Sequence, residues 1–202
     1  QSRLRTEQMQ AAVVAEFRIE QVEGLTQLRV FLGGGGKSPR ALEGEPSEIG
    51  RGVAKIAQAF GAKVCYYSTS GKNENGDYEK TTLSRLIENS DIISIHAPLN
   101  PSTENLISHS ELLQMKDGAV LLNLGRGGIV DEDALSVIID VKPIFVGLDV
   151  LAKEPMKTPH PLLAVKHPER LYITPHIAWT SREARERLIA ATIENIKTFV
   201  TA

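Results

Sequence analysis

Two kinds of apolar segment alternate from about residue 50 to the end of the chain. In one kind, apolar residues recur at helical spacing, as at Val53, Ile56, Ala57 and Phe60, and Gly61 then follows as a stop signal. In the other kind, a short run is apolar throughout, which is typical of a strand buried on both faces. The pattern predicts helices at 49–60, 83–87, 110–115, 131–139 and 181–200, and strands at 62–67, 91–96, 119–124, 144–150 and 171–174.

Strands that alternate with helices and are apolar on both faces predict an α/β fold, a doubly wound parallel sheet of the Rossmann type. We divide the chain into three parts. Residues 1–48 form an irregular N-terminal segment, with a helix expected at 6–22 and a possible first strand at 28–32. Residues 49–180 form a dinucleotide-binding domain, and residues 181–202 form a C-terminal helix.

Composition narrows the class of protein. Apolar residues make up 42% of the chain and charged residues 24%, which is ordinary for a globular domain and excludes a disordered or collagen-like chain. The net charge of −2 gives no overall attraction to nucleic acid or to an anionic membrane, so neither is expected as a partner. The one cysteine, Cys65, lies in an apolar run and is expected in the core, which fits a reducing, cytoplasmic compartment.

Two glycine-containing stretches invite comparison with phosphate-binding loops. The run Gly33–Gly36 precedes Lys37 and Ser38, but a Walker-type loop would also need glycine at position 31, which is Phe31. The second stretch leads into the helix at 49–60. It has only Gly50 of the three fingerprint glycines, with Glu45 and Ser47 where the first two would stand. Neither stretch alone identifies a nucleotide site.

Five motifs in fixed order carry more information. They are the helix-to-strand run at 48–64, H-A-P-L-N-P-S-T at 96–103, N-L-G-R-G-G-I-V at 123–130, G-L-D-V-L-A-K-E-P at 147–155, and T-P-H-I-A at 174–178. Over roughly three-quarters of its length the chain therefore resembles the D-isomer-specific 2-hydroxyacid dehydrogenases. The resemblance implies a Rossmann-type NAD(P)-binding domain. That family also has a separate N-terminal substrate domain, which residues 1–48 are too few to form.

The resemblance implies three catalytic residues: Arg126, Glu154 and His176. An imidazole exchanges protons near neutral pH, a carboxylate on its far nitrogen fixes the tautomer, and a guanidinium matches the carboxylate of a 2-oxo acid. Taken singly, each residue has an ordinary structural alternative. His176 is a surface side chain in that view, Arg126 neutralises a helix start, and Glu154 caps a turn.

Cofactor contacts are expected along the same edge of the sheet. The resemblance implies that His96 and Pro98 lie near the cofactor and that Asp149 lies near the nicotinamide amide, with a strand-end cap as the alternative for Asp149. Gly50 is expected at the pyrophosphate. The second strand ends without an acidic residue. The hydroxyl groups and the lysine that follow this strand favour NADP over NAD, and the alternative is that they form a plain polar turn. These residues are Ser68, Thr69, Ser70 and Lys72.

The sequence thus predicts an oxidoreductase that moves a hydride between NAD(P) and a small 2-hydroxy or 2-oxo acid. The alternative is a non-catalytic dinucleotide-sensing or dimerising module derived from such an enzyme. Members of the family commonly pair through the nucleotide domain, so the resemblance implies a homodimer. No metal site is expected, because the other histidines lack the spacing of metal ligands: His96, His109, His160 and His167.

Overall fold

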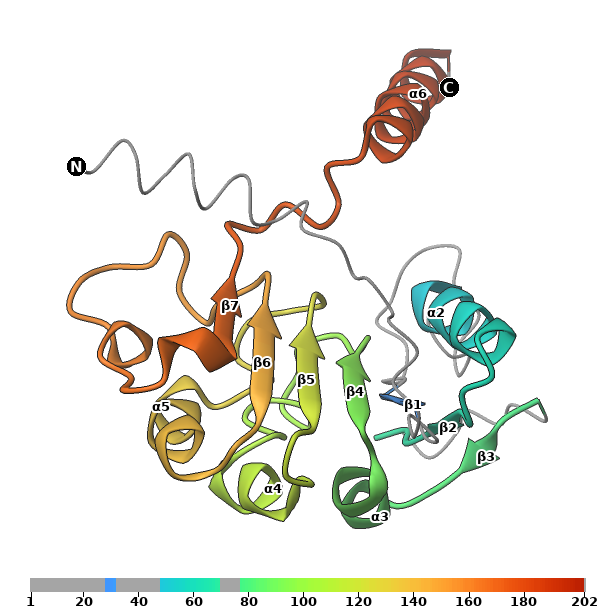
Figure 1. Ribbon diagram of the computed structural model, residues 1–202. Coiled ribbons are helices and arrows are strands. Elements are labelled where there is room, and N and C mark those ends of the chain that lie inside the picture. Colours follow the sequence, from blue (N-terminus) through green and yellow to red (C-terminus); the bar gives the residue numbers. More distant parts are fainter. Residues whose placement is uncertain (1–27, 32–47, 70–76, 202) are drawn as a thin grey trace.

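The computed structural model describes residues 28–31, 48–69 and 77–201 (Figure 1). Its strands are β1 (Leu28–Phe31), β2 (Cys65–Tyr66), β3 (Glu79–Lys80), β4 (Ile92–Ile95), β5 (Val120–Asn123), β6 (Phe145–Leu148) and β7 (Leu171–Ile173). Its helices are α2 (Glu48–Ala59), α3 (Leu83–Asn89), α4 (His109–Gln114), α5 (Glu132–Val141) and α6 (Arg182–Thr201). Two 3₁₀ helices, η1 (Pro161–Leu163) and η2 (Pro168–Arg170), precede β7.

Five strands form one sheet in the order β1-β4-β5-β6-β7, and all of its neighbours are parallel. The short strands β2 and β3 pair with each other in parallel, and β2 lies against β1. The strands β2 and β3 therefore lie on one side of β1, and the strands β4 to β7 follow in order on its other side. This confirms the doubly wound α/β class. The order reverses between β1 and β4, the place where such sheets bind ligands.

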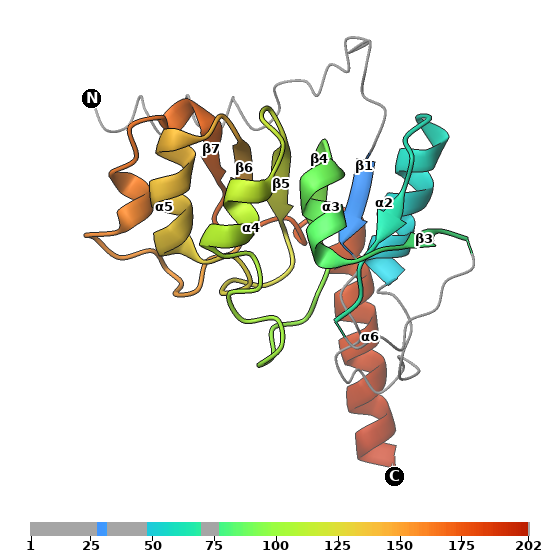
Figure 2. The same ribbon diagram turned by 90° about the horizontal axis from the view of Figure 1, so that it is seen from below.

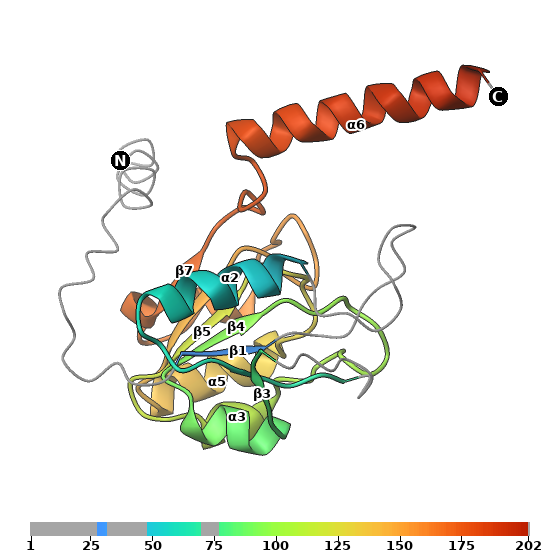
Figure 3. The same cartoon turned by 90° about the vertical axis from the view of Figure 1, so that its right-hand side faces the viewer.

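Helices lie on both sides of the sheet. Figure 2 shows α3, α4 and α5 side by side along one face, and Figure 3 shows α2 on the opposite face. Helix α6 projects away from the sheet, and none of its residues is buried. The helix expected at 181–200 is thus present. Its apolar side chains face solvent, including Leu188, Ile189, Ile193 and Ile196.

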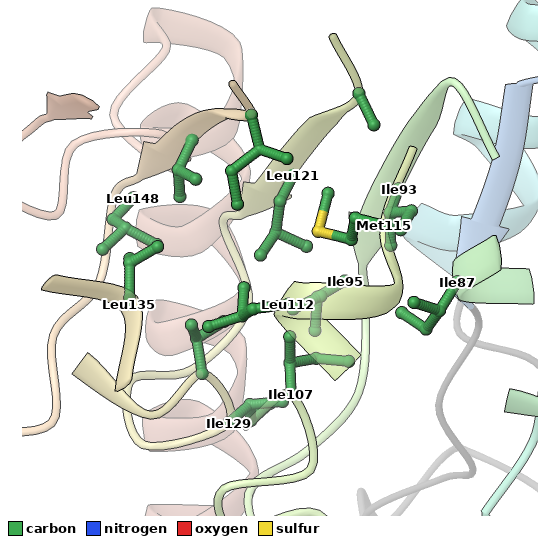
Figure 4. Close-up of a cluster of buried hydrophobic side chains, with 14 of the residues drawn as sticks. Ile87, Ile93, Ile95, Ile107, Leu112, Met115, Leu121, Ile129, Leu135 and Leu148 are labelled. Carbon is green, nitrogen blue, oxygen red and sulfur yellow. The ribbon is translucent and has the colours of Figure 1, made fainter. Parts of the chain in front are cut away.

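The core lies between the sheet and the α3–α5 layer (Figure 4). Ile93 and Ile95 of β4 and Leu121 of β5 are fully buried there, against Ile87 of α3 and Leu112 of α4. Each such side chain contributes about 1.5–3 kcal/mol of burial free energy. Cys65 is buried with them, as its apolar run predicts.

Helix starts follow the polar residues that the sequence offers. The Thr82 side chain accepts a hydrogen bond from the Arg85 N–H, and the Asp131 side chain accepts one from the Ala134 N–H. These bonds satisfy N–H groups that have no partner within the helix. Ser108 and Glu111 form a capping box at the start of α4.

The expected strand at 28–32 corresponds to β1, whereas the strand expected at 62–67 is only two residues long. Strand β3 was not expected, because its residues are exposed and polar. The helix expected at 6–22 and the glycine stretch at 33–36 lie outside the described residues. Among the helices that are described, none combines the length and the apolar character needed to cross a bilayer.

Candidate active site

The three catalytic candidates follow three neighbouring strands of the sheet. Arg126 lies in the loop after β5, Glu154 in the loop after β6 and His176 in the loop after β7. Because β5, β6 and β7 are parallel and Asn123 pairs with Leu148 at their ends, these loops leave the sheet at the same edge. Residues that are up to fifty positions apart in sequence thus reach one rim.

His176 and Glu154 are in direct contact. The imidazole Nδ1 lies 2.8 Å from Glu154 Oε2, and both side chains are partly open to solvent. The pKa of Glu154 is lowered, first because the Leu151 N–H donates to Oε1 at 2.9 Å and then because His176 donates to Oε2. An ionised carboxylate only accepts, so Nδ1 carries the hydrogen, and Nε2 is the nitrogen that can exchange a proton with a substrate.

The backbone holds His176 in an unusual conformation. Its φ of 55° lies in the left-handed region, which costs a residue with a side chain about 1–2 kcal/mol. Asp149, which is 4% exposed, offsets this cost by accepting hydrogen bonds from Thr174, from the Ile177 N–H and from the Ala178 N–H. The sequence offered Asp149 as a cofactor contact or as a strand-end cap. The structure shows its carboxylate holding the His176 loop.

Trp179 adds a contact to the main chain of His176. Its indole Nε1 donates to the His176 carbonyl at 2.9 Å, and the ring itself is half exposed. Trp179 is the one tryptophan in the sequence, so its fluorescence reports on the immediate surroundings of the candidate acid.

The Arg126 loop is built around Asn123. This side chain is 1% exposed; its Nδ2 donates to the Arg126 carbonyl at 2.8 Å, and its Oδ1 accepts from the Gly125 N–H at 3.1 Å. Arg126 itself is exposed, and its Nη1 donates to the Gly125 carbonyl at 2.7 Å. The guanidinium is therefore available to an anion at the rim, on a backbone that Asn123 fixes.

Gly127 brings this loop against the loop that carries Glu154. A Cβ at Gly127 would lie 1.9 Å from the Leu151 oxygen and 2.6 Å from the Ala152 nitrogen. Only glycine permits such an approach of two backbones. Arg126 and Glu154 thus lie on loops whose main chains touch.

The segment after β4 lies beside the point where the strand order reverses. His96 Nε2 lies 2.9 Å from the Ser94 hydroxyl, and burial lowers the pKa of His96 to about 4, so the ring is neutral at physiological pH. The buried Thr103 donates to the Pro98 carbonyl and accepts from the Asn100 N–H. These bonds fold the H-x-P-L-x-x-x-T segment into a loop that keeps His96 and Pro98 at the sheet edge.

The remaining cofactor candidates lie near β2 and α2. Gly50 is buried in the first turn of α2, and the N-terminal end of a helix is a common place for phosphate groups to bind. Ser68 is buried and Thr69 is partly exposed just after β2, whereas Ser70 and Lys72 lie outside the described residues. A helix N-terminus beside the strand-order reversal fits the pyrophosphate of a nicotinamide dinucleotide.

Sequence reasoning missed the residues that support this rim: Asn123, Gly127 and Glu132. Asn123 ends a strand one residue before a loop, a position at which side chains often hold the following turn, so a signal for it existed.

In the described part of the chain, no group of three or more histidine, cysteine or acidic side chains is placed to hold a metal ion.

Comparison with known proteins agrees with this geometry. Residues 46–178 match the model of the family "D-isomer specific 2-hydroxyacid dehydrogenase, NAD binding domain". A hydroxypyruvate reductase of Blautia hydrogenotrophica is 39% identical over 157 residues, which cover 75% of this chain and 47% of that protein. The chain thus spans about half the length of this relative.

Solved structures give the same result. The NAD complex of a D-isomer-specific 2-hydroxyacid dehydrogenase from Lactobacillus delbrueckii ssp. bulgaricus is 28% identical with a TM-score of 0.68, covering 86% of this chain and 53% of that one. An acyclic imino acid reductase in complex with NADPH and D-Arg is 30% identical with a TM-score of 0.71, covering 99% and 60%. The matched motifs, the sheet order and the His176–Glu154 rim together show that the chain belongs to the D-isomer-specific 2-hydroxyacid dehydrogenase family.

Proposed function

We propose that this chain is the nucleotide-binding part of an oxidoreductase that transfers a hydride between NAD(P) and a small 2-hydroxy or 2-oxo acid of the D-isomer type. One observation carries the proposal. The His176 imidazole is hydrogen-bonded at 2.8 Å to an ionised Glu154 at the ligand-binding edge of a doubly wound sheet, on loops in contact with the Arg126 loop. A module that only bound a dinucleotide would have no use for a held proton donor.

Reduction of a 2-oxo acid requires a hydride on the carbon, a proton on its oxygen and a cation for the carboxylate. A bound NAD(P) would supply the hydride. His176 Nε2 gives the proton, and Glu154 stabilises the imidazolium from Nδ1. Arg126 pairs with the substrate carboxylate through its planar fork of donors. In the oxidation direction the same imidazole takes the proton from the hydroxyl.

The activity is tested by reduced-nicotinamide absorbance with glyoxylate, hydroxypyruvate and pyruvate. We expect His176→Asn or Glu154→Gln to lower kcat/KM by about a hundredfold to ten-thousandfold. The matched control is His167→Gln. His167 Nδ1 also pairs with a glutamate, Glu169, at 3.0 Å, but this pair lies before β7, at the opposite edge of the sheet. Its loss should leave kcat/KM unchanged.

Two outcomes would contradict the proposal. If NAD(P) binds but none of the acids turns over, the non-catalytic dinucleotide-binding alternative is favoured. If the His167 variant is as impaired as the His176 variant, the activity does not depend on the rim.

We propose NADP as the preferred dinucleotide. The residues after β2 that the structure describes, Tyr67, Ser68 and Thr69, include no carboxylate to bind a ribose 2′-hydroxyl or to repel a 2′-phosphate. Titration of NADP and NAD against Trp179 fluorescence tests the preference, because the indole is bonded to the His176 carbonyl. Tighter binding of NAD would overturn it.

The partner predictions are tested separately. We propose a homodimer because members of the family commonly pair through the nucleotide-binding domain. Sedimentation equilibrium should then give twice the chain mass of 22.1 kDa. A monomer at micromolar concentration would contradict it. The cytoplasmic location stays a prediction from the single buried cysteine.

A further inference from the structure

The loop that carries Glu154 is tied to the start of α5 by one side chain. Glu132, the first residue of α5, accepts a hydrogen bond from the Ala152 N–H to Oε1 at 2.6 Å. Its other oxygen, Oε2, lies 3.3 Å from His160 Nε2. The two side chains are only 12% and 14% exposed. A single carboxylate therefore joins the two ends of the segment 152–160.

The protonation of His160 follows from its second contact. Its Nδ1 accepts a hydrogen bond from the Leu162 N–H at 3.3 Å and so caps η1. A nitrogen that accepts from a main-chain N–H carries no hydrogen, so in the neutral ring the hydrogen is on Nε2 and points to Glu132. The contact between His160 and Glu132 thus needs no positive charge on the imidazole.

The same backbone is restrained from the opposite side. Leu151 and Ala152 touch Gly127 of the Arg126 loop, as the 1.9 Å approach of its ideal Cβ shows. The Leu151 N–H in turn donates to Glu154 Oε1 and orients the carboxylate whose other oxygen meets His176. The position of Glu154 therefore depends on where Leu151 and Ala152 are held.

We propose that Glu132, together with His160, is a positioning pair that fixes the Glu154 carboxylate and through it the orientation of the His176 imidazole. This rests on the proposed function, in which His176 is the acid. Glu132 lies one loop away from the rim and acts by fixing Ala152. Without it, the Glu154 carboxylate has a broader range of positions and stabilises the imidazolium less.

The test is the pKa of His176, followed by proton NMR in the chain without cofactor. We expect Glu154→Gln to lower this pKa, because it removes the anionic partner, and Glu132→Ala to lower it in the same direction by a smaller amount. The matched control is Asp133→Asn. It removes a negative charge from the same helix turn, but the Asp133 side chain is exposed and the Ala152 N–H donates to Glu132 instead. The control should leave the pKa unchanged.

A double variant separates positioning from a loss of packing. If Glu132 acts through Glu154, adding Glu132→Ala to Glu154→Gln should not change the His176 pKa further, since coupled residues are non-additive. In the active protein, Glu132→Ala should lower kcat by about tenfold to a hundredfold and leave the KM for cofactor unchanged. Glu132→Gln, whose amide oxygen still accepts from the Ala152 N–H, should bring both the His176 pKa and kcat part of the way back to their values in the unchanged chain. It also replaces Glu132→Ala as the test variant should the alanine chain fail to fold.

The outcomes are distinct for the two proposals. A His176 pKa that is unaffected in both Glu132 variants, while Glu154→Gln lowers it, overturns the positioning role. A pKa that Glu154→Gln itself leaves unchanged overturns the His176–Glu154 pairing on which the proposed function depends. Lowered pKa values in a chain that turns over none of the three acids support the positioning pair and contradict the activity.

Discussion

Gly127 gives the sharpest structural prediction. Its ideal Cβ lies 1.9 Å from the Leu151 oxygen, 2.1 Å from the Leu151 carbonyl carbon and 2.6 Å from the Ala152 nitrogen. All three atoms are main chain, so no side-chain rotation can relieve the overlap. Moving the Cβ from 1.9 Å to 3.0 Å, the shortest separation that real Cβ atoms tolerate, requires the two loops to separate by about 1.1 Å. Gly127→Ala therefore forces the Arg126 loop away from the loop that carries Glu154.

Two magnitudes follow from this displacement. Overpacking against rigid neighbours costs about 1–3 kcal/mol, and the main-chain nature of the contact places Gly127→Ala at the upper end, about 3 kcal/mol. A shift of about 1 Å between catalytic groups costs about a hundredfold in rate. Urea denaturation measures the first quantity, and kcat with an active 2-oxo acid measures the second.

Gly128 next to it is the matched control. A Cβ there meets only the Leu99 methyl groups, at 3.6 and 3.7 Å, so there is room for it. Its cost comes from the positive φ of 79° and amounts to about 1–2 kcal/mol. Gly127→Ala should thus be the more destabilising of the two and should also lower kcat more than Gly128→Ala does. If the two variants lose equal stability, or if Gly127→Ala leaves kcat unchanged, the two loops are not held by this contact.

Two further predictions concern buried polar groups. Asp149→Ala removes the acceptor of the Ile177 and Ala178 N–H groups and should cost about 3 kcal/mol in urea denaturation and perturb Trp179 fluorescence. Asp140→Ala, which releases the Lys166 and His167 N–H groups elsewhere, should leave that fluorescence unchanged, and equal perturbation by both would refute the local role. Burial lowers the pKa of His96 from 6.5 to about 4 in the folded chain, so between these pH values His96 is neutral when folded and protonated when unfolded. The free energy of unfolding should therefore fall by about 3 kcal/mol as the pH drops from 6.5 to 4. His96→Gln should flatten that slope, and an unchanged slope would show that other groups cause it.

The fold was predictable where burial dictates the residue types. Strands β4, β5 and β6 are covered on at least one face, so their apolar runs identified them to within about two residues at each end. Thr82 and Asp131 stand at helix starts because a side-chain oxygen is the usual partner of the first N–H groups of a helix. Strand β3 gave no such signal, since Glu79 and Lys80 are exposed and their pairing with β2 uses main-chain groups only.

The candidate site was also predictable from the sequence only in part. The family resemblance named Arg126, Glu154 and His176, and the parallel order of β5, β6 and β7 brings the loops that carry them to one rim. The supporting contacts of Glu132 and Gly127 could not be found from the sequence. Glu132 begins a helix, where an acidic residue is ordinary, and its bond to Ala152 spans twenty positions with no periodicity to reveal it. Gly127 is one of two adjacent glycines, and only the coordinates distinguish the one that needs space from the one that needs a positive φ.

The contacts that hold the His176–Glu154 pair all lie within the described part of this chain. The atoms that position His176 and Glu154 belong to Asp149, Leu151, Trp179 and the loops that touch them, and all lie between β5 and the start of α6. The hydroxypyruvate reductase of Blautia hydrogenotrophica is about twice as long as the aligned part, yet none of these contacts involves a residue outside this chain. The hydrogen bonds that hold the proposed proton donor are therefore complete within this part of the chain, whereas we expect the choice of acid to depend on whatever faces Arg126 across the rim. Measuring the pKa first and turnover second separates the assembly of the proton donor from the selection of its substrate.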